Sequence, residues 1–178
     1  MVLAYLIKKG DNGMGKIKDF LGNEWTFDCL GCAIANRKIE IPGGVIYNGK
    51  AVFLGADPEV PIPGFLIISS KRHVTSFSQF TKEERFEIGE VLFYAEKALK
   101  DLKLTDELTI VQEERSGHFH IWVFPKYDWM VEKFGEGISY LRAISKYAKE
   151  HATDAEKENV VKIAEDVRRY FADCPILE

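Results

Sequence analysis

The clearest pattern in the chain lies at residues 116–125, where apolar side chains alternate with polar or aromatic ones. A two-residue period is typical of a strand that buries one face. One alternating set is expected to point into a core, namely Phe119, Ile121 and Val123. The other set is expected to share the opposite face, namely His118, His120, Trp122 and Phe124. Pro125 is expected to end the strand, because it has no N–H to donate to the ladder.

Apolar runs predict four more strands, at residues 45–47, 51–54, 65–68 and 108–111. Asn48-Gly49, between the first two runs, is a strong hairpin signal. Residues 2–7 are a further strand candidate, and a turn signal follows at 10–13.

Helices are predicted from caps and from apolar residues spaced three and four apart. Thr81-Lys82-Glu83-Glu84 is a capping box, and it precedes an apolar stripe made of Ile88, Val91, Leu92, Ala95, Leu99 and Leu102. After Pro125, one amphipathic helix is marked by Ile138, Leu141, Ile144 and Ala148. A last helix follows a cap at Thr153, and its inner face carries Val160, Ile163, Ala164, Val167 and Phe171. A short helical stretch is also expected at 33–38.

This order of elements indicates an α+β fold with a largely antiparallel five-stranded sheet, one long helix and two C-terminal helices. The chain has 178 residues, enough for one domain with a core. A net charge of -4 argues against general nucleic-acid binding and against an anionic membrane surface. No secretory signal or membrane-spanning apolar run is recognisable, and three cysteines are too few for a secreted disulfide framework. The expected location is therefore cytoplasmic.

Cys29 and Cys32 have the spacing at which two thiolates from one turn bind a single metal ion. His73 follows an apolar strand and His118 begins another, whereas His151 lies in a charged helix terminus and is expected to be solvated. The two cysteines with His73 and His118 would form a closed, tetrahedral zinc site of the structural kind. One alternative is a redox pair ahead of a helix, which needs a βαβ context, whereas a hairpin follows here. Another is two reduced thiols packed as small hydrophobic groups.

If the metal takes His118, then His120 is the imidazole left for chemistry. Its ordinary pKa lies near neutrality, so a neutral and nucleophilic fraction is present at about pH 7. Ser116 and Gly117 precede it and could present a hydroxyl and backbone N–H groups to phosphate oxygens. Arg115 either adds a positive charge there or pairs with a neighbouring glutamate at the surface. The alternative without function is that His118 and His120 are a pair of surface histidines on an edge strand.

With these residues assembled, the chain resembles the histidine-triad (HIT) superfamily of nucleotide hydrolases and transferases. The family signature is His-x-His-x-His, then apolar residues and often Pro with a basic residue. Residues 118–126 are similar to it, with Trp122 in the place of the third histidine. A second block, an acidic residue, a Pro-containing loop and a strand ending in Lys-x-His, is similar to residues 57–73. Cys-x-x-Cys before a short helix resembles the zinc-bearing branches.

The resemblance covers residues 29–126, which are expected to form a HIT-like nucleotide-binding domain. Residues 1–28 are then an N-terminal extension, and residues 127–178 are a C-terminal helical extension packed on the same domain. Because members of the superfamily are commonly two-fold dimers, the resemblance implies a homodimer, in which the C-terminal helices would serve as an interface or a lid.

The resemblance implies that His120 attacks the α-phosphorus of a nucleotide, and that the covalent nucleotidyl-histidine is then released to water or another acceptor. It places Asp57 on the ribose hydroxyls, and Gln112 and Ser116 near the phosphates. Trp122 cannot exchange a proton near neutrality, so it is expected either to stack on a base or sugar or to join a second apolar layer. Two functions remain: a zinc-containing nucleotide hydrolase or nucleotidyltransferase, and a non-catalytic nucleotide-binding or scaffold protein that keeps the fold and the zinc.

Overall fold

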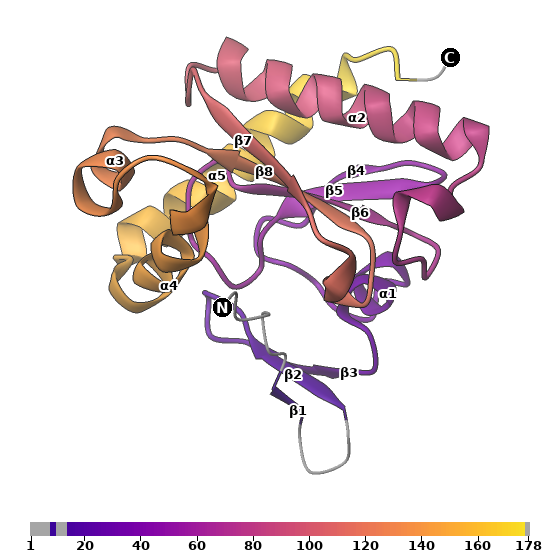
Figure 1. Cartoon of the computed structure of the whole chain (residues 1–178), viewed down its shortest axis with the longest axis horizontal. Helices are drawn as coiled ribbons and strands as arrows, with labels where there is room; N and C mark the ends of the chain where they lie inside the picture. The colour runs from indigo at the N-terminus through magenta and orange to yellow at the C-terminus, as the bar shows by residue number, and fades with distance from the viewer. Residues whose placement is uncertain (1–7, 10–13, 177–178) are drawn as a thin grey trace.

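The computed structural model describes residues 8–9 and 14–176 of the chain, whose arrangement is shown in Figure 1. The strands in this part are β1 (Lys8–Lys9), β2 (Gly15–Lys18), β3 (Glu24–Phe27), β4 (Val45–Asn48), β5 (Val52–Ala56), β6 (Leu66–Ser70), β7 (Leu108–Gln112) and β8 (His120–Pro125). The α-helices are α1 (Leu30–Ala35), α2 (Lys82–Asp101), α3 (Asp128–Phe134), α4 (Leu141–His151) and α5 (Asp154–Ala172). The strand and turn expected at 2–7 and 10–13 lie outside the described residues.

A five-stranded antiparallel sheet forms the centre of the fold, with the strand order β4-β5-β6-β8-β7. A smaller sheet has the order β1-β2-β3. The predicted α+β fold, with its antiparallel sheet, long helix and C-terminal helices, is therefore confirmed. The histidine-bearing strand β8 lies between β6 and β7, so it is held by hydrogen bonds on both sides. In the part of the chain described, no helix combines the length and the apolarity needed to cross a bilayer.

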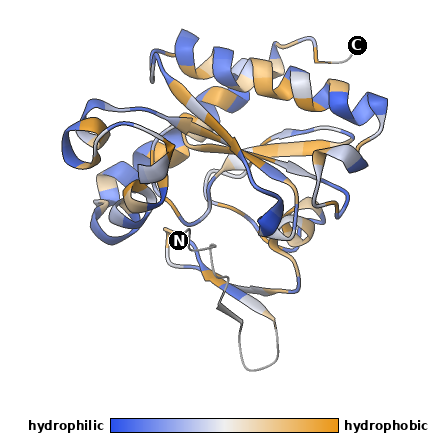
Figure 2. Cartoon of the chain, viewed as in Figure 1, coloured by the Kyte–Doolittle hydropathy of each residue, from blue (hydrophilic) through white to orange (hydrophobic). Residues whose placement is uncertain are grey.

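One face of the large sheet packs against α2 and α5, which lie together on that side in Figure 1. The three residues predicted to point inward from β8 and the turn before it are buried there: Phe119, Ile121 and Val123. In Figure 2 the central strands are mostly apolar, and α2 alternates between apolar and polar surfaces, as a helix on a sheet requires. Leu102 falls past the end of α2 and is 37% exposed, so its expected place on the buried stripe is wrong.

The opposite face of the sheet carries a second apolar cluster beside α3 and α4. Its buried members are Val60, Ile62, Phe65, Phe124, Met130, Leu141, Ile144 and Ala148. Helix α4 begins only at Leu141, and Ile138 lies in a 3-10 turn before it and is 63% exposed. The expectation that Ile138 belongs to the apolar face of this helix is therefore wrong. Helix α3 was not predicted, because its seven residues show too few turns of the helical period.

Helix α1 occupies 30–35 instead of the expected 33–38, and this shift places Cys29 at its N-cap and Cys32 in its first turn. The helix ends early because Arg37 adopts a left-handed conformation, with φ of 57°. Backbone bonds from Arg37 N to the Ile34 carbonyl and from Lys38 N to the Ala33 carbonyl close the terminus.

Candidate functional site

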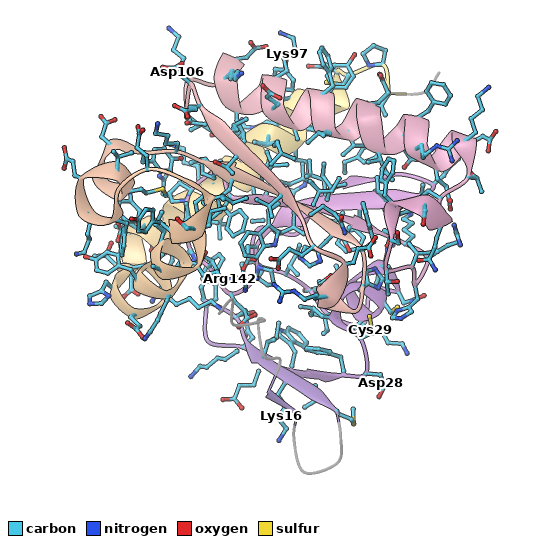
Figure 3. The ribbon with its side chains drawn as sticks, in the orientation of Figure 1. Lys16, Asp28, Cys29, Lys97, Asp106 and Arg142 are labelled. Carbon is cyan, nitrogen blue, oxygen red and sulfur yellow. The ribbon has the colours of Figure 1, made fainter. Side chains whose placement is uncertain are left out.

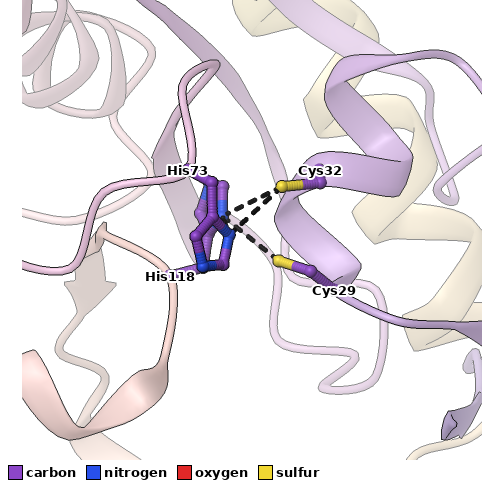
Figure 4. Close-up of side chains that lie close together, drawn as sticks. All are labelled: Cys29, Cys32, His73 and His118. Atoms are coloured by element: carbon purple, nitrogen blue, oxygen red, sulfur yellow. Dashed lines mark hydrogen bonds between the residues drawn. The ribbon is translucent and has the colours of Figure 1, made fainter.

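The two cysteines and two histidines predicted to bind metal converge at one end of the large sheet, as Figure 4 shows. Cys29 and Cys32 come from the start of α1, while His73 follows β6 and His118 precedes β8. Because β6 and β8 are antiparallel neighbours, the end of one and the start of the other lie side by side. The four ligand atoms all lie within 4.8 Å of one another.

The distances within this cluster fit a tetrahedral cation. Zinc with bonds of about 2.3 Å to sulfur and about 2.05 Å to nitrogen sets nitrogens about 3.3 Å apart, and sulfur and nitrogen about 3.5 Å apart. The two Nδ1 atoms of His73 and His118 are 3.3 Å apart. Cys32 Sγ lies 3.3 Å from His73 Nδ1 and 3.6 Å from His118 Nδ1, and Cys29 Sγ lies 3.2 Å from His118 Nδ1. Two sulfur and two nitrogen ligands make a closed set of the structural kind.

The surroundings of His118 favour metal binding through Nδ1. Its Nε2 lies 2.8 Å from the Ser70 carbonyl, to which the Nε2–H donates, so the lone pair remains on Nδ1. Burial raises the pKa of the Cys29 thiol, but hydrogen bonds from His118 and from the Cys32 backbone outweigh it and lower the pKa to about 6. Burial and the neighbouring Cys29 sulfur raise the pKa of the Cys32 thiol to about 11. A cation at the centre would stabilise both thiolates together.

Gly31, between the two cysteines, is expected to be irreplaceable. A Cβ at this position would lie 2.4 Å from His118 Cδ2, so Gly31→Ala must displace the imidazole. We expect loss of bound metal and a destabilisation of about 1–3 kcal/mol, the usual cost of overpacking. Zinc content and thermal unfolding measure both effects. Gly89→Ala is the matched control, because a Cβ there meets nothing within 4 Å on α2, and it should stabilise by about 0.5–1 kcal/mol. Normal metal content in Gly31→Ala would contradict the packing argument.

A cavity of about 330 Å³ lies next to the metal cluster, on the sheet face opposite α2. This volume is within the range of about 300–1,000 Å³ usual for small-molecule sites. Strands β5, β6 and β8 supply its floor through Gly55, Ile67, Ser69, His120 and Trp122. Figure 3 labels residues on two sides of it, Cys29 near α1 and Arg142 on α4.

His120 lines this cavity in a defined orientation. Its Nδ1 lies 3.1 Å from the His118 carbonyl oxygen, and the Nδ1–H donates to that oxygen. The lone pair of the neutral imidazole is therefore on Nε2, the nitrogen suited to nucleophilic attack. Burial lowers the pKa of His120, which favours the neutral form. His118 lies among the two cysteines and His73, and its carbonyl oxygen in turn orients His120.

The loop before β8 places Ser116 and Gly117 at the cavity wall. The Ser116 hydroxyl is 2.7 Å from the His118 carbonyl and donates to it, so this side chain steadies the same oxygen that orients His120. Gly117 has φ of 74°, a conformation that favours glycine, and it is exposed. Gln112 is exposed and pairs with Ile121 across the strands, so it shares the face of the sheet that packs against α2. The structure thus does not bring Gln112 to the cavity.

Trp122 both lines the cavity and packs in the apolar cluster beside α4. The centroid of its ring lies 5.3 Å from that of Phe65, in an edge-on contact, and 6.5 Å from that of the His120 imidazole. The two expected roles of Trp122, a stacking surface and part of a second apolar layer, are therefore compatible.

Asp57 follows β5 and also lines the cavity. Its Oδ1 accepts hydrogen bonds of 2.8 Å from the backbone N–H groups of Glu59 and Val60, which fix the turn. Burial and the charge of Glu59 raise the pKa of this carboxyl to about 6, against the two N–H groups and Lys149, which lower it. The carboxylate is thus held near a cavity at an energetic cost to the fold.

The raised pKa of Asp57 has a consequence for stability. A carboxyl with a folded-state pKa of about 6 stabilises the fold below its unfolded pKa of about 3.9, and this contribution is lost as pH rises through about 6. Asp57→Asn keeps the Oδ1 acceptor and cannot ionise. We expect the free energy of unfolding of the variant, measured in urea, to exceed that of wild type by an amount that grows between pH 4 and pH 7 and reaches about 1–3 kcal/mol. Asp106→Asn, at an exposed position, is the control, and equal pH profiles for all three proteins would contradict this account.

Two ion pairs connect α4 to the cavity rim, and sequence patterns did not reveal them. Arg142 Nη2 lies 2.5 Å from Glu113 Oε2, and Lys149 Nζ lies 3.0 Å from Glu59 Oε1. A spacing of seven residues puts both basic side chains on one face of the helix. This spacing was the signal in the sequence that could have indicated a shared role for the two residues. Which acidic partners they meet depends on the tertiary fold.

No protein-family model matches the sequence. Among solved structures, the chain is similar to a hypothetical histidine triad nucleotide-binding protein from Sulfolobus tokodaii, at a TM-score of 0.57 and 18% identity, over 79% of this chain and 92% of that one. It is also similar to a Zn-bound histidine triad family protein from Mycobacterium smegmatis, at a TM-score of 0.54 and 13% identity, over 81% and 96%. A HIT family protein from Bacillus anthracis matches at a TM-score of 0.52 and 20% identity, over 80% and 96%. The chain therefore has the fold of histidine-triad proteins.

Proposed function

We propose that the chain is a HIT-type nucleotide hydrolase or nucleotidyltransferase that acts at an α-phosphate through a covalent intermediate on His120. The observation that carries the proposal is the orientation of His120, whose Nδ1 is engaged by the His118 carbonyl in the wall of a cavity of nucleotide-compatible size. The fold shared with a histidine triad nucleotide-binding protein supports the same assignment.

In the proposed first step, the Nε2 lone pair of His120 attacks the α-phosphorus and forms a P–N bond. The bond from phosphorus to the leaving group breaks, and the leaving group departs with the electron pair. Water or another hydroxyl acceptor then attacks phosphorus from the opposite side and loses its proton to solvent, while the P–N bond breaks and its electrons return to the imidazole. Splitting one displacement into two in this way is the advantage of nucleophilic catalysis.

The structural metal would be held by Cys29, Cys32, His73 and His118, whose spacing fits zinc. A bound cation would supply a cross-link between α1, the turn after β6 and the start of β8. The role of the protein's own residues is to fix the His118 carbonyl oxygen, which accepts hydrogen bonds from both His120 Nδ1 and the Ser116 hydroxyl. A similar zinc-bound histidine triad protein supports the choice of metal.

The remaining contacts of the nucleotide are also proposals. Asp57 would accept hydrogen bonds from the ribose hydroxyls, and Gly117 would offer its backbone N–H to phosphate oxygens. Trp122 would present its ring to the base or sugar. Gln112 has no part in this arrangement because its strand position faces α2.

A substrate screen tests the proposal. Nucleoside phosphoramidates, dinucleoside polyphosphates and nucleotide sugars are incubated with the protein, and released nucleoside monophosphate or transferred nucleotide is measured. We expect turnover of at least one class. Absence of turnover together with absence of nucleotide binding in calorimetry would contradict the proposal.

A non-catalytic nucleotide-binding or scaffold protein is the second candidate, and Trp122 beside His120 is the observation that favours it. An indole near the reacting phosphate holds no proton that exchanges near neutrality. Tight nucleotide binding without turnover would select this candidate. The homodimer, the cytoplasmic location and the division of the chain at residues 28 and 126 stay predictions.

A further inference from the structure

Helix α4 contributes a positively charged side chain, that of Arg142, to the wall of the cavity. Arg142 is only 27% exposed, lines the cavity, and contacts Glu113 in the loop that leads from β7 toward His118. Glu113 also lies 3.5 Å from Arg115, so two guanidinium groups share one carboxylate at the rim. Among the described residues that line the cavity, Arg115 and Arg142 supply all of the lysine or arginine side chains.

The charges around the cavity are poorly matched to a polyphosphate unless this ion pair opens. Asp28, Asp57, Glu59 and Glu113 all line it, and the chain as a whole is acidic. Arg142 is positioned by the first turn of α4, in which its neighbour Leu141 and Ser145, three residues further on, are both buried. Glu113 belongs to a loop, and its side chain is 38% exposed, so it has solvent to move into. An anionic group entering the cavity would therefore meet a fixed guanidinium whose counter-ion is replaceable.

We propose that Arg142 binds the phosphates beyond the α-phosphate of the nucleotide, replacing its bond to Glu113, and so selects substrates with an anionic phosphate leaving group. The inference rests on the proposed function and adds a specificity-determining residue from the C-terminal helices. A guanidinium binds phosphate oxygens through two parallel N–H donors, which suits this role. The nature of Trp122 agrees with it: a phosphate departs as an anion, whereas an amine needs a proton that indole does not deliver near neutrality.

Binding of a ribonucleoside monophosphate and its triphosphate, compared in calorimetry, tests the inference. Arg142→Gln should weaken triphosphate binding by about 10- to 100-fold and leave monophosphate binding nearly unchanged. Arg142→Lys keeps the charge without the two-pronged donor and should lie between. Lys146→Gln is the matched control, because it removes the same charge from α4 at a side chain that is 75% exposed, and it should change neither affinity.

The Glu113→Gln variant separates a ligand role from a merely structural ion pair. If Arg142 binds the phosphates of the ligand, removing the competing carboxylate should tighten triphosphate binding several-fold. This change in affinity is opposite in sign to that expected for Arg142→Gln. If the pair only fastens the loop to α4, both variants should weaken binding and lower the unfolding temperature together. That outcome, or equal loss of monophosphate and triphosphate affinity in Arg142→Gln, would overturn the inference. Failure of wild type to bind either nucleotide would instead contradict the proposed function.

Discussion

Cys32→Ser is expected to lose the metal ion and to lower the thermal unfolding midpoint by about 6–12 °C, because about 3 kcal/mol of cross-linking free energy disappears. The ligands come from three segments far apart in the sequence, around residues 29–32, 73 and 118, so a bound cation ties them together in the folded state only. Treating wild type with a chelator should produce the same shift. Differential scanning calorimetry and metal analysis at one zinc ion per chain measure the two effects.

Cys174→Ser is the control for this prediction. Cys174 lies outside the cluster, where its Sγ donates to the Tyr170 carbonyl, so its replacement should leave the metal content at one per chain. A metal-free wild type that is as stable as the metal-bound protein would contradict the structural role. Alkylation of Cys29 and Cys32 in untreated protein would favour the redox alternative, since bound thiolates are protected.

His120→Asn is expected to lower turnover by about 10³-fold or more, because the residue that forms the covalent intermediate is gone. An asparagine amide can still donate to the His118 carbonyl, which spares the local structure. The loss should therefore fall on kcat, with little change in KM, in metal content or in the unfolding midpoint. The assay uses the best substrate found in the screen.

His151→Asn serves as the matched control, because His151 is exposed on α4 and stacks on Tyr147 outside the cavity that His120 lines. It should retain the wild-type rate. Turnover that survives in His120→Asn would rule out the assigned nucleophile, whereas intact binding without turnover in wild type itself would support the non-catalytic candidate.

Short-range patterns in the sequence were sufficient wherever neighbouring residues decide the structure. The alternation ending at Pro125 correctly predicted that Phe119, Ile121 and Val123 face the core beneath α2 and α5. It did not show that Phe124, on the other face, is also buried, in the cluster beside α3 and α4. The capping boxes at Thr81 and Thr153 correctly predicted where α2 and α5 begin. The four candidate metal ligands were predicted from spacing and from their positions at strand ends, and the structure brings their side-chain nitrogen and sulfur atoms together.

Features that depend on pairing between distant segments could not be predicted. The run at 108–111 has apolar residues at 108, 110 and 111, on both faces of a strand, so it does not show which face packs on the core. Only the register of β7 against β8 places Gln112 opposite Ile121 and away from the cavity. The pairing of Arg142 with Glu113 likewise depends on how α4 packs beside the loop after β7.

Mass spectrometry of the protein quenched during turnover tests the central claim most directly. Because a P–N bond to histidine is labile in acid, the quench and the digestion are kept alkaline. We predict a mass increase of one nucleotidyl group, which is a nucleoside monophosphate less one water, on the peptide that contains His120, and no increase in His120→Asn. Sustained turnover with no such adduct, or an adduct on a different residue, would contradict it.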